Sequence, residues 1–159
     1  MKKEYNAIKI PFFLWIRLHA QLREYGKNIR ESGAFLLGYT ENRKVIDFVC
    51  YHELDPDSSN FGAILFRSEN YVKLWSICKQ KNLNVIADLH THPGKNTNQS
   101  EYDRKHPMLL QRNHIAIIIP NFAKKKIPLL KGIGIYEYRG DFIWEKYSIQ
   151  SKKVVISIF

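Results

Sequence analysis

The sequence predicts a single α+β domain over residues 1–159, built as one mixed β-sheet flanked by about three helices. Three observations support this fold class. The composition is globular, with 45% hydrophobic and 25% charged residues, and the chain is long enough to bury a core. Apolar residues follow a helical spacing in some segments and form short β-type runs in others. We find no repeat, low-complexity tract or linker that would divide the chain.

The first half of the chain predicts helices alternating with short strands. Leucines at every fourth position indicate a helix over about 11–25, which begins at a proline. The runs 34–39 and 44–51 are apolar and short, and they indicate a hairpin. Residues 61–66 indicate a further strand. Ser68 is placed to cap a second helix, whose apolar residues follow a helical spacing up to Cys78.

The second half predicts a strand over 84–89, a short helix from Ser100, and then a strand over 114–119. Because residues 114–119 are apolar on both faces, we expect that strand to lie inside the sheet. The chain should end with a hairpin that turns at Arg139-Gly140 and with a β-forming tail, and these last elements cover 131–138, 142–149 and 153–159.

The net charge of +10 raises the question of a nucleic-acid partner. The lysines are scattered, apart from Lys124-Lys125-Lys126 and Lys152-Lys153, so nucleic acid is not expected as the main partner. An acidic protein surface is the alternative that the charge leaves open.

Cys50 and Cys78 each lie in an apolar segment, which indicates two buried free thiols in a reducing compartment. No stretch is long enough to cross a bilayer, and Lys9 interrupts the apolar start of the chain. We therefore expect a cytoplasmic protein without a membrane partner.

The segment LHTHPGKNTNQSEYD, residues 89–103, carries the strongest signal for chemistry. His90 and His92 stand two residues apart at a strand end, so both imidazoles should point to one face. Pro93 forces the chain out of the sheet at that point. Asp103, in the first turn of the next helix, can return as a third ligand. Two histidines and one aspartate would leave one position of a tetrahedral Zn²⁺ open for water.

Plainer interpretations of the same residues remain open. His90 and His92 could be two surface histidines in a turn. Ser100 and Asp103 also form a capping pattern for the helix. Glu31, just before the first apolar strand, is our candidate general base, and it could equally be an ordinary exposed loop carboxylate. The other histidines are interpreted as surface or capping residues, namely His19, His52, His106 and His114.

These residues resemble a known family. Glu31, Gly33 and Leu37-Gly38 are similar to the E-x-G-x-x-L-G strand of the JAMM (JAB/MPN) metallopeptidases. His90-Thr91-His92-Pro93, followed by Ser100 and Asp103, has the spacing of that family's H-[ST]-H-P…S-x-x-D signature, over a resemblance that covers roughly residues 10–148. Asp88 resembles an acidic residue common in the prokaryotic branch, whereas Pro107 departs from the pattern and should kink the helix of Asp103 or restart it.

The resemblance implies an MPN/JAB-like, cytidine-deaminase-like fold and a Zn²⁺ cofactor. It implies His90, His92 and Asp103 as ligands, Glu31 as general base, and Ser100 as a donor to the oxyanion. It further implies cleavage of a peptide or isopeptide bond after the C-terminus of ubiquitin or a ubiquitin-like protein. Some bacterial members act beside E1- and E2-like operon partners in antiphage defence.

Two other functions are weighed against this one. The first is a metal-free MPN-type scaffold that only binds partners, which the intact ligand set disfavours. The second is a RadC-type, nucleic-acid-associated protein. Thr91 between the histidines disfavours it, because RadC-type proteins usually carry asparagine there.

Overall fold

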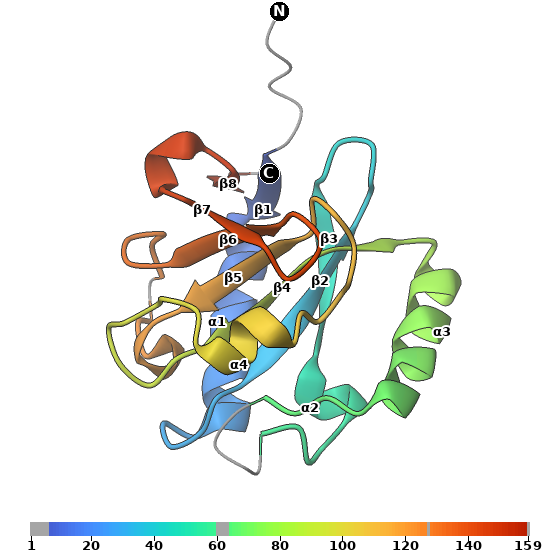
Figure 1. Cartoon of the computed structure of the whole chain (residues 1–159), viewed down its shortest axis with the longest axis horizontal. Helices are drawn as coiled ribbons and strands as arrows, with labels where there is room; N and C mark the ends of the chain where they lie inside the picture. Colours follow the sequence, from blue (N-terminus) through green and yellow to red (C-terminus); the bar gives the residue numbers. More distant parts are fainter. Residues whose placement is uncertain (1–6, 60–63, 127, 159) are drawn as a thin grey trace, which may run out of the picture.

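In a computed structural model of the chain, which describes residues 7–59, 64–126 and 128–158, six strands form one mixed sheet (Figure 1). Their order is β3-β2-β4-β5-β6-β7. Strands β4 and β5 pair in parallel, and all other neighbours in this sheet are antiparallel. The strands are β2 (Gly33–Gly38), β3 (Val45–Cys50), β4 (Asn84–Thr91), β5 (Ile115–Ile119), β6 (Gly134–Tyr138) and β7 (Trp144–Tyr147).

A smaller parallel sheet joins the two ends of the described chain, where β1 (Ile8–Pro11) pairs with β8 (Val154–Ser157). Among the described residues, four α-helices flank the large sheet, and Figure 1 shows α1 behind it and α4 in front. The helices are α1 (Phe12–Gly26), α2 (Tyr51–Leu54), α3 (Tyr71–Lys81) and α4 (Glu101–Lys105), with 3-10 turns η1 (Ser68–Asn70), η2 (Asn121–Ala123) and η3 (Ile149–Ser151).

The sheet separates two hydrophobic clusters, because alternate residues of each strand point to opposite faces. On the α1 face, the leucines of the helix belong to one cluster with residues of β4 and β5, among them Ala87 and Leu89. On the other face, Phe35 and Leu37 of β2 pack against Leu74 of α3. Both clusters are nearly free of solvent, so the whole of β2 is buried.

The predicted fold class is confirmed, because the sheet is mixed and a few helices flank it. The predicted internal strand is β5, the fourth of six. The hairpin turn at Arg139-Gly140 is present between β6 and β7, where the Arg139 N–H donates to the Ile143 carbonyl. Cys50 and Cys78 are buried and free, as predicted.

Three predictions of local structure are wrong. Residues 64–66 form no strand, and the rest of that predicted strand, 61–63, lies outside the described residues. Ser68 makes no capping bond to α3. It begins the 3-10 turn η1, which lies directly before α3 in the chain. No helix restarts at Pro107: α4 ends at Lys105, and the described residues 107–110 are irregular.

Strand β1 is an addition that the sequence did not predict. Its four residues precede α1 directly, and its partner β8 comes from the far end of the chain.

Within the ranges that the structure describes, no helix is both long and apolar enough to cross a membrane.

Candidate metal centre

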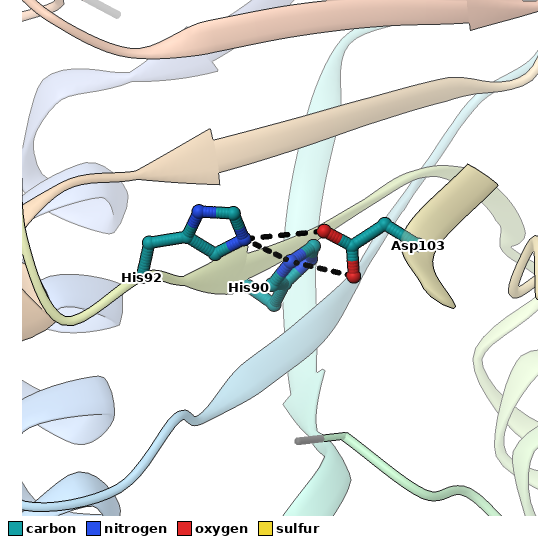
Figure 2. Close-up of side chains that lie close together, drawn as sticks. All are labelled: His90, His92 and Asp103. Atoms are coloured by element: carbon teal, nitrogen blue, oxygen red, sulfur yellow. Dashed lines mark hydrogen bonds and ion pairs between the residues drawn. The ribbon is translucent and has the colours of Figure 1, made fainter. Parts of the chain in front are cut away.

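Strand β4 places both histidines on the face opposite α1. His90 pairs with Gly33 of β2 and with Ile118 of β5, so it stands in the middle of the sheet. The His92 N–H donates to the Ile119 carbonyl at 2.8 Å, which keeps the chain extended one residue beyond β4. Figure 2 shows the two imidazoles on the same side of this strand, both directed toward Asp103.

Helix α4 places the aspartate. Its first turn is closed by a capping box, in which the Asp103 N–H donates to Ser100 Oγ at 3.0 Å and the Ser100 N–H donates to Asp103 Oδ2 at 2.9 Å. The Trp144 indole N–H donates to the Arg104 carbonyl at 3.1 Å and ties the helix to β7. Since α4 ends before Pro107, the proline does not disturb the direction of Asp103.

The three side chains meet at one point. His90 Nε2 lies 3.1 Å from His92 Nε2. Asp103 Oδ2 lies 3.2 Å from His92 Nε2, and Asp103 Oδ1 lies 3.4 Å from His90 Nε2. One ligand atom from each residue lies within 4.8 Å of the others, so this group could hold a metal ion. Nitrogen and carboxylate donors in this number are typical of zinc, although they do not specify it.

The hydrogen bonds of His92 fit a cation at this point. His92 Nδ1 lies 2.9 Å from the Asn96 carbonyl, and a carbonyl only accepts, so Nδ1 carries the proton. In a neutral ring, Nε2 then presents a lone pair toward the Asp103 carboxylate. Two acceptors face each other stably only across a positive charge, which is either a proton or a metal ion. The Asn96 carbonyl is thus the kind of outer partner that fixes a ligating histidine.

The electrostatics agree with that geometry. Burial alone would raise the pKa of Asp103, but hydrogen bonds from His90 and His92 hold the pKa of this carboxyl well below its usual range. Burial lowers the pKa of His92, yet its bonds to Asp103 and Asn96 outweigh burial and raise it. Asp103 is therefore ionised and ready to bind a cation.

Glu31 lies near the same centre, in the chain just before β2. The pairing of β2 with β4 continues beyond Gly33, because the Thr91 N–H donates to the Ser32 carbonyl at 2.8 Å. Glu31 comes two residues before Gly33, so alternation puts its side chain on the face of His90 and His92. Burial raises the pKa of Glu31, partly opposed by His90 and His92, whose charges lower it. Its carboxylate is not part of the group of three donors formed by His90, His92 and Asp103.

Gly33 makes room for a buried network below the histidines. A Cβ on Gly33 would lie 2.3 Å from Cε2 of Tyr51, so no larger residue leaves space for that ring. The Tyr51 hydroxyl donates to Asp88 Oδ2 at 3.2 Å, and His114 Nε2 lies 2.5 Å from Asp88 Oδ1. Asp88 is only 2% exposed, and both of its oxygens are engaged.

The turn η2 fixes the loop that follows His92. The Phe122 N–H donates to the His92 carbonyl at 2.9 Å, and the Asn121 N–H donates to the Gly94 carbonyl at 3.0 Å. All three residues of η2 have positive φ, between 52° and 59°, a strained state for side chains other than glycine. The Arg23 guanidinium, from α1, donates to the carbonyls of Ala123 and Lys125, at 3.0 Å each, and holds the turn in place.

A cavity of about 30 Å³ opens beside the ligands. Its polar wall includes His90, Asp103 and Asp88, and its apolar wall includes Met108 and Trp144. The volume accommodates about one or two water molecules. The centre thus has water-sized space next to the ligand atoms, which is what a hydrolytic site requires.

The structure brings His90, His92 and Asp103 together, with Ser100 hydrogen-bonded to Asp103 and Glu31 on the same face. Of the residues that support the site, the sequence pointed to Asp88 and missed the others. His114 and His19 were interpreted as surface or capping residues, but both are buried, and His114 bonds to Asp88. Asp88 carried a signal, as an acidic residue inside an apolar strand, whereas Arg23 carried none.

The structure is similar to several solved structures. A protein from Desulfitobacterium hafniense, determined in solution, has a TM-score of 0.64 and 12% identity, covering 94% of this chain and 92% of its own. A protein from Salinibacter ruber has a TM-score of 0.52 and 15% identity, covering 88% of each chain. A JAB1/MPN domain protein from Archaeoglobus fulgidus has a TM-score of 0.47 and 16% identity, covering 94% of this chain and 98% of its own.

No protein-family model matches the sequence. At these identities the first two structures share the fold with this chain, and the likeness extends no further than the fold. The chain is therefore an α+β domain with a mixed six-stranded sheet, and it carries a His-His-Asp group that could bind a metal ion.

Proposed function

We propose that this protein is a Zn²⁺-dependent peptidase or isopeptidase that hydrolyses the amide bond after the C-terminus of a ubiquitin-like protein. The observation that carries the proposal is the convergence of His90, His92 and Asp103, with Glu31 directed to the same face. The choice of Zn²⁺ rests on the donor set, which leaves one tetrahedral position open. The choice of a ubiquitin-like substrate, and of an antiphage setting with E1- and E2-like partners, rests on the resemblance of the motif to JAMM peptidases.

Zn²⁺ bound here would act as a Lewis acid and bring the pKa of water toward neutrality. Glu31 is then the group that accepts the proton of the attacking water. Its raised pKa suits a carboxylate that must take a proton and give it up again. We assign to Glu31 the return of that proton to the leaving amine, which in an isopeptide is a lysine side chain.

Ser100 combines two roles without conflict. Its Oγ accepts the Asp103 N–H and caps α4, which uses a lone pair. The hydroxyl hydrogen remains to be donated to the oxygen of the scissile carbonyl as negative charge develops there. A preorganised donor of this kind contributes about 3 kcal/mol to the transition state. Ser100 can therefore cap α4 and donate to the oxyanion at the same time.

The test uses the full chain, its zinc content by elemental analysis, and the hydrolysis of ubiquitin C-terminal aminomethylcoumarin as a surrogate amide. We expect bound zinc, loss of turnover with a chelator, and recovery when zinc is added back. Glu31→Gln should keep the zinc and lower turnover by about 10²–10⁴-fold. His90→Ala should lose both zinc and turnover.

The outcomes separate the competing functions. A chain that binds no zinc on titration would sink the metallopeptidase proposal outright. Zinc binding without cleavage of ubiquitin-like amides would count against the proposed substrate and leave the metal site standing, whereas the metal-free scaffold predicts a chain that binds no zinc. Wild-type turnover in Glu31→Gln would remove Glu31 as the base and leave the metal site intact.

A further inference from the structure

Five lysines gather on the side of the site where His92 leaves the sheet. Lys95 lies in the loop after His92, Lys124–Lys126 follow η2, and Lys131 precedes β6. All five are exposed. They are called the lysine flank below. Together they make up a large part of the protein's excess positive charge, which is +10 over the whole chain.

Backbone contacts hold the segments of the lysine flank next to each other and to the site. The Asn121 N–H donates to the Gly94 carbonyl at 3.0 Å, and the Thr97 hydroxyl donates to the Gly132 carbonyl at 3.0 Å. Figure 1 shows the loop after β4 and the segment from η2 to β6 side by side, at the lower left of the view. The flank is therefore continuous with the loop that carries His92.

No carboxylate neutralises these lysines in the part of the chain that the structure describes. None of the five takes part in an ion pair there. The sequence over residues 104–136 contains no aspartate or glutamate at all. Other basic residues are compensated, as Lys81 is by Asp47 and Lys105 by Glu101. The flank thus presents unbalanced positive charge on the loops that follow His92 and η2.

An apolar recess adjoins this charge. A cavity of about 20 Å³ lies between α1 and the flank and is lined by Lys125, Lys131, Leu129 and Ile133, among others. Leu129 is 63% exposed at its rim. The recess holds about one water-sized group, such as the terminal methyl of an aliphatic side chain, and is too small for a nucleobase. A ligand that fits both features carries negative charge and an apolar side chain.

We propose that the lysine flank binds an acidic, leucine- or isoleucine-bearing segment of the protein substrate and steers it to the metal centre. The partner class follows from charge complementarity and from the recess. A single-strand nucleic-acid site would instead offer aromatic stacking surfaces and arginine, and the flank consists of lysines around an aliphatic recess. The role in catalysis rests on the proposed function, whereas binding to the flank does not.

The experiment measures binding to the Glu31→Gln chain, with and without added zinc, by fluorescence anisotropy. The probes are a fluorescein-labelled glutamate-leucine peptide, a glutamate-only peptide and an oligothymidylate of equal charge.

Lys124→Glu/Lys125→Glu should weaken the binding of the glutamate-leucine peptide by about tenfold or more at low salt. Lys79→Glu/Lys152→Glu makes the same change in net charge away from the flank, at two exposed lysines, and should change the affinity by less than about threefold. Leu129→Ser should weaken the binding of the glutamate-leucine peptide by about fivefold and leave the binding of the glutamate-only peptide unchanged.

Equal losses in the two double variants would show that only the net charge attracts the peptide, and would overturn the proposal. Tighter binding of the oligothymidylate than of the peptide would overturn it in favour of nucleic acid. Because the assay needs no turnover, an inactive protein that still binds through the flank would count against the proposed peptidase function alone.

Discussion

The two faces of strand β4 are equally buried but chemically opposite. Ala87 and Leu89 are fully buried against α1, in the larger hydrophobic cluster. Asp88 and His90, one residue away in each case, are 2% and 9% exposed on the other face. Burial therefore does not distinguish a structural face from a chemical one. What distinguishes them is that the polar atoms of Asp88 and His90 face charged or hydrogen-bonding partners.

The strongest test of this difference between the two faces of β4 truncates neighbouring residues that point to opposite faces. Leu89→Ala removes packing against α1 and should lower the free energy of unfolding by about 2–5 kcal/mol. The zinc affinity of the folded fraction should stay within about threefold of wild type. His90→Ala should abolish zinc binding and cost the metal-free protein less stability than Leu89→Ala does. Urea unfolding in a chelator and competition with a fluorescent zinc indicator measure the two effects.

Equal loss of zinc affinity in Leu89→Ala would contradict the separation of the faces. It would mean that the α1 face sets the geometry of the ligands through the strand itself. Ala87→Gly offers a milder variant if Leu89→Ala does not fold.

The α1 side also buries a titratable group, His19, and pH should reveal it. Burial lowers the pKa of His19 to about 4, although its bond to the Trp15 carbonyl opposes that shift. The unfolded chain takes up this proton near pH 6.5, before the folded protein does, so stability present above pH 6.5 is lost as pH falls toward 4. The loss should be about 3 kcal/mol.

His19→Gln serves as the comparison, because its amide does not titrate. Urea unfolding of both proteins between pH 7.5 and about pH 4, with chelator present, gives the difference directly. A wild-type curve parallel to that of the variant would show that His19 protonates as readily in the folded protein as in the unfolded chain.

The sequence could predict the candidate ligands because they are close along the chain. His90 and His92 follow from strand alternation, and Asp103 lies in the first turn of the next helix. The aim of Asp103 is set by its own capping box with Ser100, which is also local. The prediction of a local motif of this kind does not depend on the neighbouring elements, so the wrongly predicted helix restart at Pro107 did not affect it.

The framework of the site could not be predicted in the same way, because it depends on distant pairings. His114 was placed at a strand start as a surface residue, and the parallel register of β4 and β5 is what brings it to Asp88. The pairing of β1 with β8 joins opposite ends of the chain. Propensity and periodicity describe single segments, so they carry no information about which strands become neighbours.

Arg23 gives the smallest effect that we expect, and it links the two faces. This residue belongs to α1, yet its guanidinium holds η2, whose Phe122 N–H binds the His92 carbonyl. Arg23→Ala should release the strained turn and weaken zinc affinity by about 3–10-fold, less than the 10–100-fold typical of direct partners of a ligand. Arg23→Lys, which can still donate to one carbonyl, should recover part of the loss. Val154→Ala, remote from the site in β8, is the control for a general loss of stability. If Arg23→Ala and Val154→Ala lose equal stability and both keep wild-type zinc affinity, then Arg23 supports the fold without positioning His92.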